Sequence, residues 1–223
     1  NNRLWISKQE ALIASLKLQP ILVVIRPEEK DLENSHCKCS LIPIFDKLDA
    51  LGIKHVGIAW SNQPAWKDLV SEIKLKFKGI YLGASSITTT QALDLTIDLG
   101  LNYSMSPIWS QELQNYARKS NHVLVPGVFT PTEFHQANQF GCRLIKAFPA
   151  SLLGINILNQ IKYPLGVLPF TIAAGGLNIK DINPWLNSGF GAIALGRGLI
   201  NNYKLNPELE IWIENNQRQN LNM

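Results

Sequence analysis

The sequence predicts an α/β protein: a single (β/α)8 TIM barrel domain over residues 1–223, with an extra N-terminal helix at residues 1–19. Two observations carry this prediction. Short apolar runs bounded by Gly or Pro alternate with longer amphipathic stretches from end to end, and eight such strand and helix units can be counted. The length of 223 residues also suits one barrel domain. A doubly wound open sheet is the alternative architecture.

The units can be followed in order along the chain. A capping box, Ser7-Lys-Gln-Glu10, precedes an amphipathic stretch at residues 11–18 and predicts the first helix. Residues 21–25 predict the first buried strand. The further strands are predicted at residues 55–60, 79–83, 102–106, 122–126, 143–148, 169–173 and 191–195. The helices between them are predicted at residues 65–77, 89–99, 110–119, 131–140, 154–161 and 179–188.

Two segments do not fit the repeating unit. Residues 28–51 look like a lengthened first loop, in which His36, Cys37 and Cys39 precede an apolar, helix-like stretch at residues 41–51. Such a loop either shapes the substrate entrance of a barrel or is simply solvated. Residues 212–223 are rich in Asn and Gln, and we expect them to fray beyond the last helix.

Composition excludes several classes of function. The net charge of +4 comes from 21 basic and 17 acidic residues without a basic block, so nucleic-acid binding is not indicated. No apolar run approaches the roughly 18 residues that span a bilayer, so no membrane association is expected. An odd number of cysteines, 3, favours a reducing, cytoplasmic location. Because the Cys37–Cys39 pair has no second ligand cluster at zinc-type spacing, we expect no metal and no cofactor.

Lys146 is the first candidate for chemistry. It is the one cation in the apolar run Leu144-Ile-Lys-Ala-Phe-Pro-Ala150, near the carboxyl end of the predicted sixth strand, where catalytic groups of barrels lie. Burial lowers the pKa of a lysine, and a neutral amine can attack a ketone to form a Schiff base. The alternative is a lysine at a strand end that reaches solvent.

Two glycine loops are candidates for anion binding. Gly175 and Gly176 follow the seventh strand, and Gly196 and Arg197 follow the eighth. The loops after these two strands are a frequent phosphate site in barrels, and Arg197 adds a fixed positive charge with forked donors.

These motifs together resemble the 2-keto-3-deoxy-6-phosphogluconate and 4-hydroxy-2-oxoglutarate aldolases, which are class I aldolases. The resemblance rests on Val125-Pro-Gly-Val-Phe-Thr-Pro-Thr-Glu133, Leu144-Ile-Lys-Ala-Phe-Pro-Ala150, Ala174-Gly-Gly-Leu177, Ser106-Pro107, and Gly83-Ala-Ser-Ser86 in place of the family's Gly-Ala-Gly-Thr. It implies that Lys146 forms an imine with pyruvate, and that Ser86, with Arg26, holds the carboxylate. It also implies a lyase of carbohydrate metabolism that acts on a 2-oxo acid, in the form of a homotrimer.

The chain departs from the family on the second strand. Alignment on Leu51-Gly-Ile-Lys-His-Val56 puts Gly57 at the position of the proton-shuttling glutamate and Ser61 at that of an arginine. His55 lies on the same strand face as Gly57 and is a candidate proton shuttle, although it stands about 7 Å further from the active-site end. The alternatives are a water at Gly57, or a side chain of the first loop such as Glu28 or Glu29.

Three functions follow from these residues. The first is a Schiff-base aldolase that cleaves a 2-keto-3-deoxy-6-phosphogluconate-like or 4-hydroxy-2-oxoglutarate-like substrate to pyruvate. The second is a family member that binds a sugar phosphate or 2-oxo acid without cleaving it, which the absence of the glutamate favours. The third is a phosphate-binding isomerase or epimerase, for which the predicted strand ends show no opposed acid/base pair.

Overall fold

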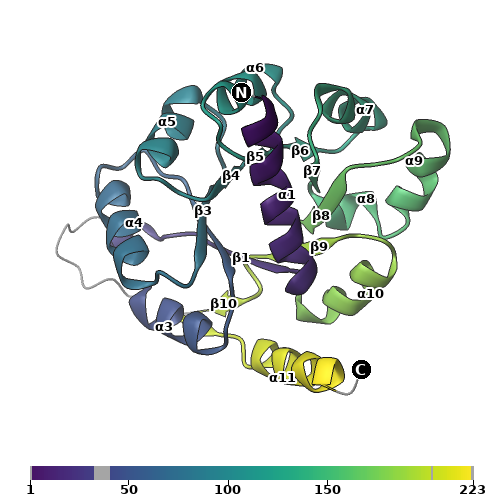
Figure 1. Cartoon of the computed structure of the whole chain (residues 1–223). Helices are drawn as coiled ribbons and strands as arrows, with labels where there is room; N and C mark the ends of the chain where they lie inside the picture. The colour runs from purple at the N-terminus through teal and green to yellow at the C-terminus, as the bar shows by residue number, and fades with distance from the viewer. Residues whose placement is uncertain (1, 33–40, 202, 222–223) are drawn as a thin grey trace.

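Parallel strands form a nearly closed barrel in the computed structural model, which describes residues 2–32, 41–201 and 203–221 (Figure 1). The hydrogen-bonded order is β5-β4-β3-β2-β1-β9-β8-β7-β6. β5 and β6 stand at the two ends of this order, yet they are adjacent in sequence on either side of Pro126, so together they fill one strand position. The predicted (β/α)8 fold is confirmed, and the open-sheet alternative is wrong.

The strands are short, and their central residues are buried. Their bounds are β1 Ile21–Ile25, β2 His55–Ala59, β3 Tyr81–Ser85, β4 Tyr103–Met105, β5 Leu124–Val125, β6 Gly127–Val128, β7 Leu144–Ala147, β8 Phe170–Ala174 and β9 Ala192–Leu195. Alternate side chains point inward and outward, as in any barrel. On β1, for example, Ile21 and Val23 pack in the main core with the helices, while Leu22 packs in the barrel interior.

The helices form a ring around the strands (Figure 1). Their bounds are α2 Glu29–Leu32, α3 Ile42–Ala50, α4 Ala65–Lys76, α5 Thr90–Asp98, α6 Gln111–Lys119, α7 Pro131–Phe140, α8 Ala150–Leu153, α9 Ile157–Leu165, the 3-10 helix η1 Ile179–Asp181 and α10 Ile182–Asn187. α7 has the predicted bounds because its ends are strongly signalled. Thr130 and Glu133 form a capping box around Pro131, and Gly141 ends the helix in the left-handed conformation.

The first helix lies within the predicted residues 1–19, but it does not begin at the predicted capping box. α1 runs over Asn2–Leu18, so Ser7 lies inside it and does not cap it. The physical reason is the packing of its first turns, because Trp5 and Gln9 are already buried against the barrel. A helix before the first strand was predicted and is confirmed.

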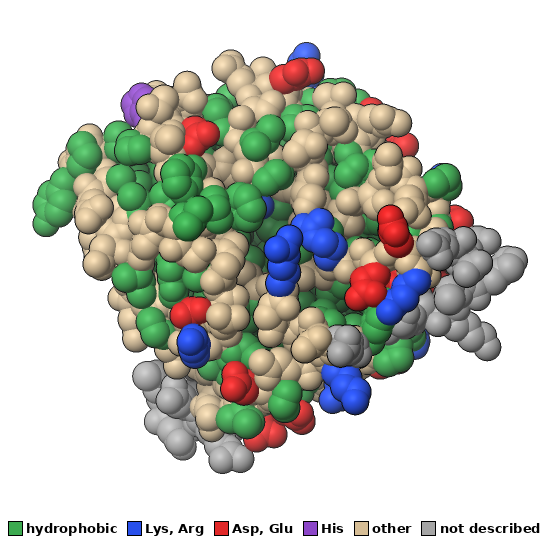
Figure 2. Space-filling model, turned by 180° about the vertical axis from the view of Figure 1, so that it is seen from behind, with side chains coloured by type: hydrophobic (Ala, Val, Ile, Leu, Met, Phe, Trp, Pro, Cys, Tyr) green, Lys and Arg blue, Asp and Glu red, His purple; other side chains and the backbone are tan. Residues whose placement is uncertain are grey.

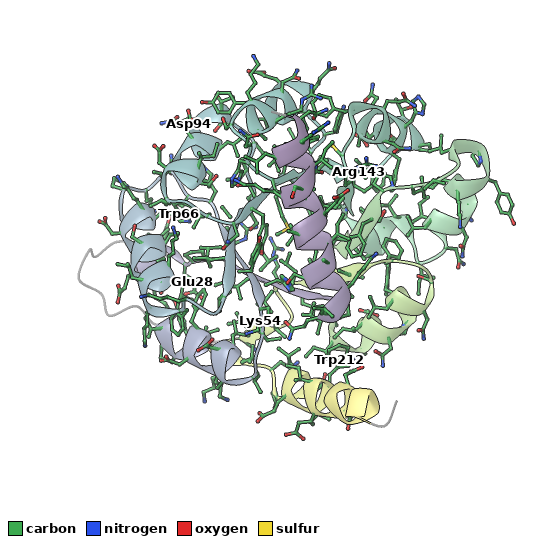
Figure 3. All side chains as sticks on the ribbon, viewed as in Figure 1. Glu28, Lys54, Trp66, Asp94, Arg143 and Trp212 are labelled. Atoms are coloured by element: carbon green, nitrogen blue, oxygen red, sulfur yellow. The ribbon has the colours of Figure 1, made fainter. Side chains whose placement is uncertain are left out.

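α1 closes the amino end of the barrel. In Figure 1 it crosses in front of the strands, and Leu12 and Leu16 belong to the same apolar cluster as the inward residues of the strands. Side chains of α1 and the turn after it bond to both sides of the barrel: the Gln9 side chain accepts from the backbone N–H of Arg143, and that of Gln19 accepts from the N–H of Lys54. Figure 3 shows Arg143 and Lys54 on opposite sides of this helix. The carboxyl end is therefore the end that remains open.

The chain ends in a small hairpin and a helix. The strands β10 Ile200–Asn201 and β11 Lys204–Leu205 pair in antiparallel fashion, and α11 spans Glu208–Leu221. The stretch that we expected to fray from residue 212 is thus helical as far as residue 221. Leu209 and Ile213 are buried, and Trp212 Nε1 donates to Asn183 Oδ1 of α10 at 3.0 Å, which holds this helix on the barrel.

The lengthened first loop is described in part. Of this loop, residues 28–32 and 41–51 are described, with the predicted helix at residues 41–51 present as α3. His36, Cys37 and Cys39 lie outside the described residues. No helix in the described ranges combines the length and the apolar character needed to cross a membrane.

Candidate active site

Lys146 lies at the third position of β7 and lines a cavity of about 620 Å³ at the carboxyl end of the barrel. Its side chain is buried, and Nζ lies 4.8 Å from the centroid of the Phe148 ring. It forms no ion pair with any residue that the structure describes. Burial lowers the pKa of Lys146 to about 7, so a large share of the amine is neutral at neutral pH and able to attack a carbonyl carbon.

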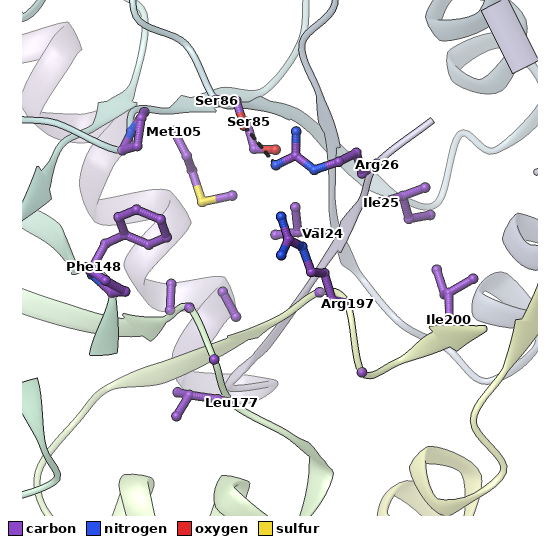
Figure 4. A pocket seen from close by; sticks show the side chains of 18 of the residues that line it. Val24, Ile25, Arg26, Ser85, Ser86, Met105, Phe148, Leu177, Arg197 and Ile200 are labelled. Atoms are coloured by element: carbon purple, nitrogen blue, oxygen red, sulfur yellow. Dashed lines mark hydrogen bonds between the residues drawn. The ribbon is translucent and has the colours of Figure 1, made fainter. Parts of the chain in front are cut away.

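Two arginines reach over the same cavity. Arg26 follows β1 and Arg197 follows β9, and Figure 4 shows both guanidinium groups directed toward the middle of the pocket. Arg26 Nη2 donates to Ser86 Oγ at 3.4 Å. Neither arginine forms an ion pair with a carboxylate in the described ranges. Together with Lys146 they make a cavity that attracts anions.

Ser86 follows β3 with an unusual backbone. Its φ of 63° lies in the left-handed region, which a serine rarely adopts. Strained backbone of this kind collects at ligand sites, because the surrounding structure must hold it in place. The strain directs the Ser86 hydroxyl toward Arg26, so the two predicted carboxylate-binding residues are brought together.

The two glycine loops line the same cavity. Gly175 and Gly176 have φ angles of 94° and 76°, and a Cβ at Gly176 would clash with the Ser151 side chain. A Cβ at Gly198 would likewise clash with Asn178 Oδ1. Glycine therefore lets the backbone of these loops approach closely beside Arg197, as an anion site of backbone N–H groups requires.

Acids are scarce in this cavity. Among the described residues that line it, Glu28 at the rim is the one carboxylate. Its Oε2 pairs with Lys30 Nζ at 3.0 Å and lies 3.1 Å from the Tyr203 hydroxyl. The hydrogen bond from Lys30 holds the pKa of Glu28 below its usual value, so it is ionised and already partnered. Glu29 is not among the lining residues.

His55 lies away from the cavity, at the amino end of the barrel. It is fully buried, its Nε2 lies 2.7 Å from Ser15 Oγ of α1, and its Nδ1 lies 3.2 Å from the carbonyl oxygen of Ile21. Burial lowers the pKa of His55 to about 4, so the ring is neutral at neutral pH. The strand face predicted for His55 is the inner one, but α1 covers that end.

Ser61 and Gly57 are the residues that the resemblance aligns with an arginine and a glutamate of the family. Ser61 caps a turn, where its Oγ accepts from the N–H of Gln63 at 3.3 Å, and it does not line the cavity. A Cβ at Gly57 would lie 3.3 Å from Met105 Cε and 3.7 Å from the Tyr103 hydroxyl. Both neighbours belong to β4, so side chains of β4 pack against Gly57.

Sequence patterns did not reveal Ser85, Met105 or Phe148 as parts of this site, nor the approach of the buried Tyr103, which does not line the cavity, to Gly57. Ser85 and Met105 line the cavity, and Phe148 contacts the lysine. For Ser85 a signal exists, because it replaces a glycine of the family pattern. For Tyr103 the signal is the pair of glycines, Gly57 and Gly83, that face its ring from the neighbouring strands.

The chain is similar in sequence to known aldolases. A family model described as KDPG and KHG aldolase, that is, 2-keto-3-deoxy-6-phosphogluconate and 4-hydroxy-2-oxoglutarate aldolase, matches residues 12–210. A probable 2-dehydro-3-deoxy-6-phosphogalactonate aldolase of Rhizobium meliloti is 26% identical over 187 residues, which cover 81% of this chain and 82% of the relative. A 2-dehydro-3-deoxy-phosphogluconate aldolase of Dickeya dadantii is 23% identical over 183 residues, covering 82% and 80%.

A solved structure supports the fold. It is the KDPG aldolase from Legionella pneumophila with pyruvate captured as a covalent carbinolamine intermediate, and it superposes with a TM-score of 0.72 at 22% identity. The match covers 92% of this chain and 91% of that one.

Proposed function

The chain belongs to the KDPG and KHG aldolase family, and on that premise we propose that it is a class I aldolase whose Lys146 forms an imine with a 2-oxo acid. The observation that carries the proposal is a buried lysine with a pKa of about 7 in a cavity that also holds two arginines. Such an amine attacks the C2 carbonyl carbon, and the iminium that forms withdraws electrons when the C3–C4 bond breaks. The proposed products are pyruvate and an aldehyde, which is glyoxylate for a 4-hydroxy-2-oxoglutarate-like substrate.

The other predicted residues receive binding roles in this proposal. Ser86 and Arg26 hold the carboxylate next to the ketone. Gly175, Gly176, Gly196 and Arg197 hold the distal phosphate or carboxylate. Because both sets of residues line one cavity, they support a ligand that carries two anionic groups. The chemistry needs no metal or cofactor.

The experiment is trapping with pyruvate and borohydride, followed by mass spectrometry of the intact and digested protein. We expect one reduced adduct, on Lys146, and none in a Lys146→Met variant that remains folded. The exposed Lys162 supplies the matched control, since Lys162→Met should leave the adduct unchanged. An adduct absent from the wild-type protein, or found on another lysine, would overturn the proposal.

A family member that binds without cleaving is the second candidate. The observation that favours it is Gly57 in the place of the glutamate, in a cavity whose one described acid is already paired. Turnover of 2-keto-3-deoxy-6-phosphogluconate and of 4-hydroxy-2-oxoglutarate separates the two. An adduct without release of pyruvate from either substrate would support the binding protein.

We also propose that the chain is a homotrimer in the cytoplasm. Ile108, Phe129 and Leu152 are exposed apolar side chains in segments that follow β4, β6 and β7. Figure 2 shows hydrophobic side chains gathered on one side of the face that carries the hollow. Cys142, a buried free thiol, is compatible with a reducing compartment. Light scattering of the purified protein tests the assembly, and a monomeric mass would refute it.

A further inference from the structure

Two hydroxyl groups in the barrel interior have no hydrogen-bond partner among the residues that the structure describes. They are the hydroxyls of Ser85 on β3 and Tyr103 on β4, and both side chains are more than nine-tenths buried. An unsatisfied buried hydroxyl destabilises a protein by about 1–3 kcal/mol, so each such group calls for an explanation. A bound water or a catalytic role is the usual one.

Strand register places both hydroxyls around the vacated glutamate position. Gly57 pairs with Gly83 and Ala59 pairs with Ser85, while Gly83 in turn pairs with Tyr103. Ser85 is therefore one inward position further toward the open end than Gly83, and it lines the cavity with Lys146.

The Tyr103 ring reaches the same place because two glycines make room for it. A Cβ at Gly83 would lie 2.5 Å from the ring, so only glycine lets the ring lie across β3. The hydroxyl then lies 3.7 Å from the point where a Cβ at Gly57 would stand. The pKa of Tyr103 is raised by burial, so the phenol keeps its proton and acts as a donor.

We propose that Ser85 and Tyr103 are positioning residues that hold the oxygen leaving the carbinolamine on Lys146, so that this oxygen does the proton transfer for which relatives use the glutamate. This inference rests on the proposed function. Met105, whose methyl group lies 3.3 Å from the Gly57 Cβ point, must turn aside to admit the oxygen. Its unbranched thioether side chain can do so.

The steps balance without any added base. The Lys146 nitrogen bonds to C2, the carbonyl π pair moves to oxygen, and one nitrogen proton moves to that oxygen. The C2–O bond then breaks, the nitrogen lone pair forms the iminium, and the oxygen departs as hydroxide, held by the hydroxyls of Ser85 and Tyr103. This hydroxide removes a proton from C3 to give an enamine, or from the C4 hydroxyl when the C3–C4 bond breaks, and becomes water.

Exchange of the pyruvate methyl protons in D2O, followed by proton NMR, measures the transfer directly. We expect the wild-type protein to catalyse exchange, and Tyr103→Phe and Ser85→Ala each to lower its rate by roughly 10²-fold. Tyr81→Phe is the matched control, because Tyr81 stacks on Tyr103 with 6.3 Å between ring centroids. Ser85→Thr keeps a hydroxyl and should retain most of the exchange.

Three readouts separate this role from a structural one. Tyr103→Phe should not lower the melting temperature, since it removes only an unpartnered hydroxyl. The end-point yield of the borohydride adduct should stay at the wild-type level in both variants. The wild-type exchange rate should level off above pH 7. In the variant that combines Ser85→Ala and Tyr103→Phe the rate should keep rising with pH, because hydroxide from bulk solvent must replace the hydroxide that the two hydroxyls hold.

The outcomes distinguish the two proposals. No wild-type adduct overturns the proposed function and this inference with it. A wild-type adduct, with exchange in the double variant at the wild-type rate, overturns this inference alone. An adduct in a wild-type protein that catalyses no exchange also overturns it.

Discussion

Replacement of Lys146 by methionine should stabilise the folded protein at neutral pH while abolishing imine formation. The side chain is 5% exposed and forms no ion pair with a described residue, and burial lowers its pKa from 10.5 to about 7. The Lys146 amine therefore binds its proton less tightly in the folded protein than in the unfolded chain, and this difference lowers the free energy of unfolding. Methionine keeps the unbranched stem and its packing against Phe148 without the charge.

The magnitude follows from the two pKa values. One pKa unit corresponds to about 1.4 kcal/mol, so the difference between 10.5 and about 7 amounts to at most about 5 kcal/mol, of which about 4.5 kcal/mol remains at pH 7, where the folded protein is half protonated. Below pH 7 both states are protonated and the penalty is complete. Between pH 7 and 10.5 the unfolded chain binds more protons than the folded one, so wild-type stability rises with pH and the advantage of the variant shrinks.

Urea unfolding at pH 6, 7.5 and 9, followed by circular dichroism, gives the free energies of unfolding of both proteins. Lys162→Met, at an exposed position, should stay within about 0.5 kcal/mol of the wild type at every pH. A Lys146→Met protein that is less stable than the wild type at pH 7 would refute the reasoning. So would an advantage that grows with pH.

Three further predictions concern the same cavity. The rate of borohydride trapping with pyruvate should increase with pH through about 7, as the Lys146 amine loses its proton; a rate that is flat from pH 6 to 8 would contradict the lowered pKa. Arg197→Ala should weaken the binding of glycerol 3-phosphate, measured by calorimetry, by about 1.5–3 kcal/mol and that of pyruvate much less; equal losses for both ligands would remove Arg197 from the distal site. Gly83→Ala should lower the free energy of unfolding by about 1–3 kcal/mol, because its Cβ would meet the Tyr103 ring at 2.5 Å; an unchanged urea midpoint would show that the ring has room to move.

The fold followed from the sequence because each strand is a short apolar run with clear breaks. The differences lie where tertiary contacts override local signals. α1 begins five residues before Ser7, because the barrel buries Trp5. Pro126, which has no N–H to donate, divides the fifth strand into β5 and β6.

The candidate site was predictable only where a residue type carries its own signal. A lone lysine in an apolar strand and glycine pairs after strands are such signals, and the structure brings Lys146, Gly176 and Arg197 to one cavity. The alternation of side chains along the second strand predicted that His55 lies on the inner face, but it did not indicate that α1 covers the amino end of the barrel. The approach of Tyr103 to Gly57 depends on the register of three strands, which a single sequence does not specify.

Because α1 covers the amino end of the barrel, the cavity opens at the carboxyl end alone among the described residues. Leu12 and Leu16 fill the amino end, so the described residues leave the carboxyl end, where the two arginines lie, as the way in and out. Two ligands in this cavity would then bind and leave in a fixed order. The ligand nearest Lys146 would bind first and leave last. In the proposed aldolase reaction, an aldehyde bound between pyruvate and the opening would leave before pyruvate is released. Excess aldehyde would therefore slow the release of pyruvate from the imine on Lys146.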